Sequence, residues 1–324
     1  MPSSTVIVFG PSGHVASVAA QTAASLGAQV HLALRDPSKA IPLLDSSSHK
    51  FPRVQADLTQ PETVQAAARA TGATAAFIYR VFGGGANDHM RGTLRALRDG
   101  GVRFVVFLSS GTVTPRDAAA LSGAYGPDRL IPFEHAETEA ALAEVFGPGA
   151  YAAVRPGFFA TNLLNYKKMV AEAGTSGGVI KAPYPAAEFD FIAPEDMGRV
   201  CGRLLVDGPE LLGAGKEAVF LAGPQVVPQG QVIELLGEVL GKELKAENYA
   251  SDDEAVQSIM ADHALPESTA RQLVASYRAT AEGKPVFDPS TYAEGVANVE
   301  KYSGRPAMTI REWLEANKDK FVQA

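Results

Sequence analysis

Two glycines and an alanine near the start of the chain have the spacing of a phosphate-holding loop. Gly10-x-x-Gly13-x-x-Ala16 directly follows the apolar run Val6–Phe9. The first glycine allows a sharp turn, the second lets the backbone approach a pyrophosphate, and the small third residue keeps the next helix close to the strand. The free N–H groups at the start of that helix would face the phosphates. The motif alone also fits an ordinary turn between a strand and a helix.

A basic residue stands at the end of the second apolar run, where dinucleotide sites distinguish two cofactors. The run ends Leu34-Arg35-Asp36-Pro37, and Lys39 lies one helical turn further on. An acidic residue here would bind the ribose 2′-hydroxyl of NAD(H), whereas an arginine accommodates the 2′-phosphate of NADP(H). Because Asp36 before Pro37 also fits a helix N-cap, we favour NADP(H). The alternative is that Arg35 and Lys39 are surface charges.

Two further apolar runs end in residues that we expect beside the cofactor. Asp57 and Leu58 follow the third run, where the carboxylate could accept from an adenine amine while Leu58 packs on the ring. Asp57 equally fits a turn. Tyr79 and Arg80 follow the fourth run, and Arg80 could contact a phosphate or an acidic substrate. Arg80 could also be an incidental loop charge.

Hydroxyl groups follow the fifth apolar run, beside the place expected for the nicotinamide. Ser109 and Ser110 could donate to a substrate carbonyl, and we name both as candidate catalytic residues. Serines in turns equally often satisfy local backbone groups. Both interpretations stay open at this point.

Alternating strands and helices would bring these residues to one edge of a sheet. Repeated βα units predict a parallel, right-handed, doubly wound sheet, and ligands of such sheets bind at the carboxyl ends of the strands. The strands are expected at Thr5–Phe9, Gln29–Leu34, Arg53–Ala56, Ala73–Tyr79, Val102–Ser109 and Tyr151–Arg155. The intervening helices are expected near 14–26, 37–45, 61–71, 87–99 and 129–146.

The second half of the chain loses this alternation. It predicts a helix over Phe158–Ala173, a helix over Glu195–Val206, a returning strand at Val219–Leu221 and further helices towards the C-terminus. We therefore expect an α/β protein: a Rossmann-type doubly wound parallel sheet with helices on both faces, and a smaller, mostly helical C-terminal substrate lobe. The expected domains are residues 1–156 for NADP(H) and 157–324 for the substrate, with segments near 189–222 returning to the sheet.

Side chains of this second half could form a substrate wall. The candidates for a substrate pocket are Phe159, Asn162, Tyr166 and Tyr184. Ligand pockets are mostly apolar and aromatic with a few polar groups, which this set would supply. The alternative is that the aromatic residues belong to the core.

Composition narrows the classes of protein. The chain has 324 residues, is 46% hydrophobic and 20% charged, and carries a net charge of -7, so it has no basic footprint for nucleic acid. No clustered His/Cys set indicates a metal, and no apolar stretch has the length of a membrane span. The single Cys201 cannot form an internal disulfide. We expect a soluble cytoplasmic protein with a small-molecule substrate, and the oligomeric state stays open.

Taken together, the ordered motifs resemble the NmrA-like branch of the atypical short-chain dehydrogenases/reductases. Besides the glycine loop and the segments around Arg35, Asp57 and Ser109, the resemblance rests on Val154-Arg155-Pro156-Gly157-Phe158-Phe159 and Phe191-Ile192-Ala193-Pro194-Glu195-Asp196-Met197-Gly198. It covers most of residues 5–222. It implies a Rossmann fold and NADP(H) binding, and the family includes both reductases and redox-sensing regulators.

The resemblance also assigns roles to residues. It implies that the pyrophosphate loop consists of Gly10, Ser12, Gly13, His14 and Val15. Arg35 and Lys39 would hold the 2′-phosphate, and Asp57 with Leu58 the adenine. Pro156, Gly157 and Phe158 would lie along the nicotinamide.

The sequence departs from the short-chain dehydrogenases at their catalytic dyad, a Tyr and a Lys one helical turn apart. No lysine occurs between Lys50 and Lys167. Tyr125-Gly126-Pro127-Asp128-Arg129 predicts a turn, because Pro127 would start a new helix. His135, on that helix, could replace the lysine as an acid/base or as a ribose partner. It could also be a partly exposed helical histidine.

These features predict an NADP(H)-dependent oxidoreductase that transfers hydride to or from a small apolar or aromatic carbonyl, enone, imine or quinone. The cofactor would carry the chemistry, and the protein would orient the substrate. The absent dyad leaves two alternatives. One is an NADP(H)-sensing regulatory protein that binds partner proteins without turnover, and the other is a cofactor-bound enzyme with non-redox chemistry.

Overall fold

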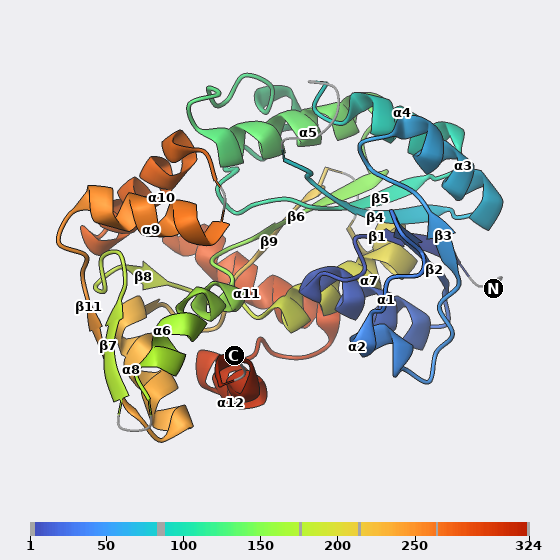
Figure 1. Cartoon of the computed structure of the whole chain (residues 1–324). Helices are drawn as coiled ribbons and strands as arrows, with labels where there is room; N and C mark the ends of the chain where they lie inside the picture. Colours follow the sequence, from blue (N-terminus) through green and yellow to red (C-terminus); the bar gives the residue numbers. More distant parts are fainter. Residues whose placement is uncertain (1–3, 83–87, 175–176, 213–214, 264, 323–324) are drawn as a thin grey trace.

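The computed structural model describes residues 4–82, 88–174, 177–212, 215–263 and 265–322. Its centre is a seven-stranded parallel sheet in the order β3-β2-β1-β4-β5-β6-β9 (Figure 1). The strands are β1 (Thr5–Phe9), β2 (Gln29–Leu34), β3 (Arg53–Gln55), β4 (Ala75–Tyr79), β5 (Phe104–Leu108), β6 (Tyr151–Pro156) and β9 (Ala218–Leu221). The expected Rossmann-type fold is thereby confirmed, because the strand order reverses beside β1 as in dinucleotide-binding sheets.

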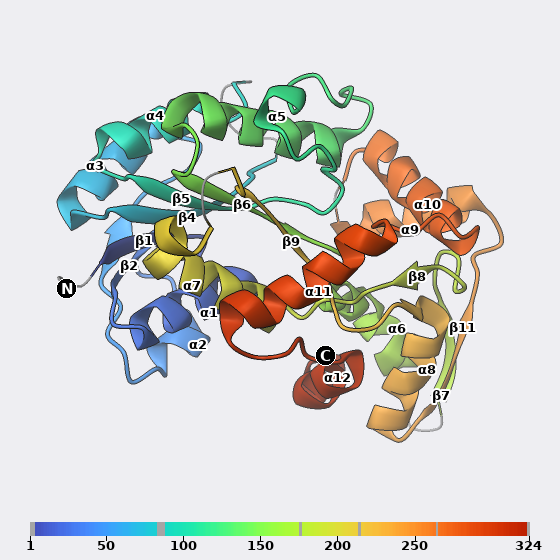
Figure 2. The same cartoon turned by 180° about the vertical axis from the view of Figure 1, so that it is seen from behind.

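Helices cover both faces of this sheet, which explains why its central strands are continuous apolar runs. Figures 1 and 2 show one layer formed by α3 (Pro61–Thr71), α4 (Arg91–Asp99) and α5 (Leu130–Phe146). The other layer contains α1 (His14–Ser25), α2 (Pro42–Asp45) and α7 (Pro194–Leu212). Two hydrophobic clusters, one per face, form the core on either side of the sheet.

Glycines of α7 bring that helix against α1, the helix that follows the glycine loop. A Cβ added at Gly198 would lie 2.5 Å from the Cβ of Val18, and one at Gly202 would lie 2.5 Å from the Cβ of Thr22. Such distances exclude any larger residue without movement of α1. The second half of the chain therefore supports the phosphate loop.

The C-terminal part packs beside the sheet around its own apolar cluster, which includes Trp313 (Figure 2). Its helices are α6 (Lys167–Glu172), α8 (Gln229–Leu240), α9 (Asp252–His263), α10 (Glu267–Ala281) and α12 (Ile310–Asn317). The helix α11 (Pro289–Ser303) instead packs against α7 and β9, and its Val299 and Tyr302 belong to a cluster of the sheet. Short 3-10 helices occupy Ala118–Ala120, Ala160–Tyr166 and Lys318–Phe321. Two small sheets pair β7 (Gly177–Lys181) with β11 (Glu243–Glu247) and β8 (Glu188–Phe189) with β10 (Val227–Pro228).

Several expected bounds differ from the structure. The helix predicted over Phe158–Ala173 is a 3-10 segment followed by the short α6, and β7 and β11 were not predicted at all. The helix predicted over 37–45 begins only at Pro42. The predicted return of the chain to the sheet is confirmed by β9, which pairs with β6. The division into domains at residue 156 stays a prediction.

None of the described helices has both the length and the apolar character needed to cross a membrane.

Candidate functional site

Two cavities at the carboxyl ends of the strands share lining residues and form one groove. The first, about 730 Å³, extends from the end of β2 to the glycine loop, and the second, about 410 Å³, extends from that loop towards β5 and β6. Gly10, Ser12 and Tyr79 line both. The groove therefore suits an extended ligand that crosses the sheet at its topological switch point.

The glycine loop has the geometry that the sequence predicts for it. Gly10 has a φ of +64°, in the left-handed region, and a Cβ there would lie 2.4 Å from the ring of Tyr79. The Gly13 N–H donates to the Gly10 carbonyl at 2.9 Å and closes the turn. No side chain caps the start of α1, so the N–H groups of its first turn are available to an anion. Gly13, His14 and Val15 line the second cavity.

The opposite end of the groove carries two basic residues, as the sequence predicts. Arg35 and Lys39 line the first cavity, and neither forms an ion pair with a described residue. The Asp36 carboxylate accepts from the Ser38 N–H at 2.9 Å and from the Ser38 hydroxyl at 2.6 Å. The predicted N-cap role of Asp36 is wrong, because its side chain stabilises a turn and no helix begins there. The acidic side chain is nevertheless engaged locally.

Asp57 and Leu58 lie in the same cavity, with the carboxylate occupied by a turn. Asp57 accepts from the Thr59 N–H at 2.9 Å and from the Thr59 hydroxyl at 2.8 Å. Leu58 is buried, and its carbonyl accepts from the Thr93 hydroxyl at 2.7 Å. The turn interpretation of Asp57 is therefore correct, while its place in the groove leaves the adenine role open as a prediction.

The Arg80 side chain does not line the groove. Its guanidinium donates from Nε to Glu134 at 2.9 Å and from Nη1 to the Val81 carbonyl at 2.7 Å. His89 Nδ1 lies 3.2 Å from the same Glu134 carboxylate. The structure therefore gives Arg80 an ion pair between β4 and α5 rather than a place beside a phosphate.

None of the three residues expected along the nicotinamide lines the groove, although the neighbouring Phe159 does. Leu108, Phe159, Thr161 and Pro194 line the second cavity, so Phe159 belongs to the groove rather than to a separate pocket. Pro156, Gly157 and Phe158 line neither of the two cavities.

A buried ion pair lies directly behind the end of β5. Arg155 Nη2 donates to Glu139 at 2.6 Å, and both side chains are almost fully buried. Arg155 Nη1 also donates to the carbonyls of Val113 and Pro115, at 3.0 and 2.8 Å. The Ser109 hydroxyl donates to Glu139 Oε1 at 2.5 Å. This network holds Ser109 and the loop after β5 in place.

The candidate catalytic residues do not line the groove. Ser109 is buried in the network, and the Ser110 hydroxyl lies 2.9 Å from the Thr112 hydroxyl, so both serines satisfy local groups. His135 Nδ1 lies 2.8 Å from the Ile131 carbonyl, and the ring packs against Phe107. The expectation of a partly exposed histidine is wrong: His135 is buried, and burial lowers its pKa to about 4.

A third cavity, of about 290 Å³, contains two of the four expected pocket residues, Asn162 and Tyr166, together with Phe158. The Tyr166 hydroxyl donates to Gln229 at 3.0 Å. Tyr184 is not part of this cavity. Its hydroxyl donates to Asp252 at 2.6 Å and accepts from Arg278 at 2.7 Å, in a polar cluster beside α9 and α10.

Residues to which the sequence assigned no role complete the groove. Pro11, Thr59, Val81, Phe82, Leu108, Thr161 and Pro194 are among its lining residues. Thr161 and Pro194 come from the second half, and only the fold brings them to the loop. A sequence signal did exist for the buried pair, because Arg155 interrupts a strand that is otherwise apolar.

Comparisons with known proteins support this description. The family model of the NmrA-like family matches residues 2–314. The nitrogen metabolite regulation-like protein bik4 of Gibberella fujikuroi is 34% identical over 97% of this chain and 98% of its own. A (4-alkanoyl-5-oxo-2,5-dihydrofuran-3-yl)methyl phosphate reductase of Streptomyces griseus is 27% identical over 68% of each chain.

Among solved structures, the NADPH complex of the quinone oxidoreductase QOR2 from Escherichia coli has a similar fold. The TM-score is 0.71 at 21% identity, covering 96% of this chain and 99% of that one. Because the family model spans nearly the whole sequence and bik4 aligns with almost all of it, this protein belongs to the NmrA-like family.

Proposed function

We propose that the protein is an NADP(H)-dependent oxidoreductase acting on a small apolar or aromatic carbonyl, enone, imine or quinone. The observation that carries the proposal is the groove, which joins the uncapped start of α1 to Arg35 and Lys39 after β2. Neither basic side chain has an ion-pair partner among the described residues. The reductase from Streptomyces griseus and the QOR2 fold support a redox reaction. A bound nicotinamide would supply the hydride.

The residues of the groove fit an NADP(H) molecule in their chemistry. The α1 N-terminus would bind the pyrophosphate, and the Arg35 guanidinium would bind the 2′-phosphate through charge-assisted hydrogen bonds. Leu58 and the turn at Asp57 would border the adenine. Leu108 and Phe159 would exclude water at the far end of the groove, where the substrate approaches.

The sequence suggests His135, Ser109 or Ser110 for proton delivery, although none of the three lines the groove. With a pKa near 4, the His135 ring is uncharged at neutral pH, so it would act as a hydrogen-bond partner or base rather than as an acid. Ser109 would relay a proton only after its hydroxyl leaves Glu139.

The test is consumption of NADPH, followed by the absorbance of the reduced nicotinamide, against a panel of quinones, enones, imines and aldehydes. We expect turnover with at least one class. NADPH binding without turnover across the panel would contradict the enzyme proposal.

A second function is favoured by the relative with the greatest coverage described above. bik4 is named a nitrogen metabolite regulation-like protein. A dinucleotide-sensing regulator would bind a partner protein differently in NADP⁺ and in NADPH. Affinity capture with each nucleotide, using Arg35→Ala as the control, would reveal such a partner.

A further inference from the structure

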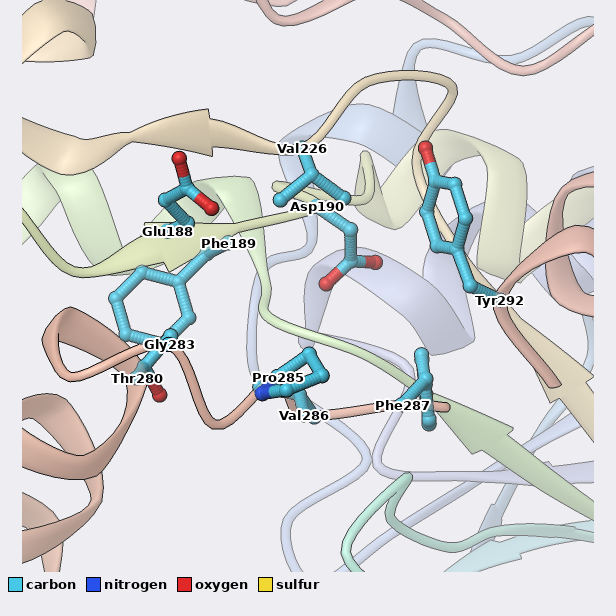
Figure 3. Close-up of a pocket in the computed structure, with 10 residues that line it drawn as sticks. All are labelled: Glu188, Phe189, Asp190, Val226, Thr280, Gly283, Pro285, Val286, Phe287 and Tyr292. Atoms are coloured by element: carbon cyan, nitrogen blue, oxygen red, sulfur yellow. The ribbon is translucent and has the colours of Figure 1, made fainter. Parts of the chain in front are cut away.

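A fourth cavity, separate from the groove, encloses a buried carboxylate between aromatic side chains. It has a volume of about 260 Å³ and shares no lining residue with the groove or with the cavity around Phe158. Figure 3 shows Asp190 pointing into the space that Phe189, Phe287 and Tyr292 enclose. The cavity lies between β8, the segment after β9 and the start of α11.

Asp190 has hydrogen-bond donors but no counter-charge. It is 5% exposed, and it accepts from the Phe158 N–H at 2.8 Å and from the Gly223 N–H at 3.0 Å. It forms no ion pair with any residue in the described part of the chain. The two carboxylate oxygens have about four lone-pair sites, so these backbone N–H groups leave the carboxylate with further acceptor capacity. Burial raises the pKa of Asp190 to about 6, against the lowering effect of its backbone hydrogen bonds.

The other residues that line the cavity also favour a positively charged ligand. Glu188 also lines the cavity, and none of the described lining residues is Lys, Arg or His. Lys284, next in sequence to two lining residues, is paired with Glu282 at 3.8 Å. Aromatic faces attract cations, and Phe189 is held firmly because it stacks on Phe158 with ring centroids 4.1 Å apart.

We propose that this cavity binds a small organic ammonium ion, with the ammonium on Asp190 and an apolar or aromatic body against Phe189, Phe287 and Tyr292. The volume suits an arylalkylamine of about ten non-hydrogen atoms. This site is independent of the proposed cofactor groove, so it could regulate the protein or bind a second small molecule whether or not NADP(H) binds.

The test is isothermal titration calorimetry with phenethylammonium chloride and with its neutral counterpart 2-phenylethanol. We expect the amine to bind at least tenfold more tightly than the alcohol. Asp190→Asn should remove this preference, and Glu188→Gln should reduce it about threefold. Glu62→Gln, on the distant α3, is the matched charge control and should leave it unchanged.

Asp190 also accepts two backbone N–H groups, so its variant is checked for folding by its melting temperature. Should Asp190→Asn not fold, Val226→Trp at the cavity mouth replaces it and should weaken binding of both compounds. Equal affinity for amine and alcohol, no binding of the amine to the wild-type protein, or a preference that survives Asp190→Asn in a folded variant would overturn the proposal. Because amine binding is measured directly, its outcome does not depend on whether NADPH binds.

Discussion

The ion pair between Arg155 and Glu139 allows the most quantitative prediction. Both side chains are 1–2% exposed, and three of the Arg155 hydrogen bonds go to Glu139. Removing one partner of such a buried pair leaves an uncompensated charge, which costs about 3–5 kcal/mol. We therefore expect Glu139→Gln and Arg155→Met each to lower the free energy of unfolding by about that amount. The double variant should lose much less than the sum, because neither charge is then left alone.

The assay is urea unfolding followed by circular dichroism, with free energies from linear extrapolation. The matched control is Glu238→Gln, because Glu238 pairs with Arg311 at 2.7 Å but both side chains are more than half exposed. That variant should cost about 1 kcal/mol or less. Additive effects in the double variant, or single variants no worse than the control, would refute the reasoning that the network holds the end of β5.

Two other predictions test the loop and the buried histidine. Gly10→Ala should abolish NADPH binding, because Gly10 has a φ of +64° and the Tyr79 ring leaves no room for a Cβ. The control Gly72→Ala, at a φ of +65° but with open space around it, should keep NADPH binding. Equal binding of NADPH by both variants would contradict this reasoning. For His135, burial lowers the pKa from 6.5 to about 4, so the unfolded chain takes up the proton first and stability falls as the pH drops from about 6.5 to 4. Urea unfolding should show that His135→Gln loses roughly 3 kcal/mol less than the wild type over that range, and equal losses would count against burial as the cause.

The parts of the groove that depend on local sequence pattern could be predicted from the sequence. β1 and β2 have the predicted bounds, because continuous apolar runs between turns specify buried parallel strands. Gly10, Gly13 and Arg35 then follow from their positions at strand ends, and they line the groove as expected.

Features that depend on long-range contacts could not be predicted. Glu243–Glu247 alternates charged and apolar residues and becomes a strand only because β7 pairs with it. Arg80 was expected beside a phosphate, but Glu134, 54 residues later, provides its partner. Asp190 stands between two phenylalanines in the sequence, and nothing there indicates that the Phe158 and Gly223 N–H groups stabilise its burial.

The central claim is that the groove binds NADP(H) through Arg35. Isothermal titration calorimetry of NADPH and NADH with the wild-type protein and Arg35→Ala tests it most directly. A charged hydrogen bond contributes about 1.5–3 kcal/mol, so we expect the wild type to prefer NADPH by roughly 10- to 100-fold and Arg35→Ala to lose that preference. Equal affinity for the two cofactors, or an NADPH preference that persists in Arg35→Ala, would contradict the account.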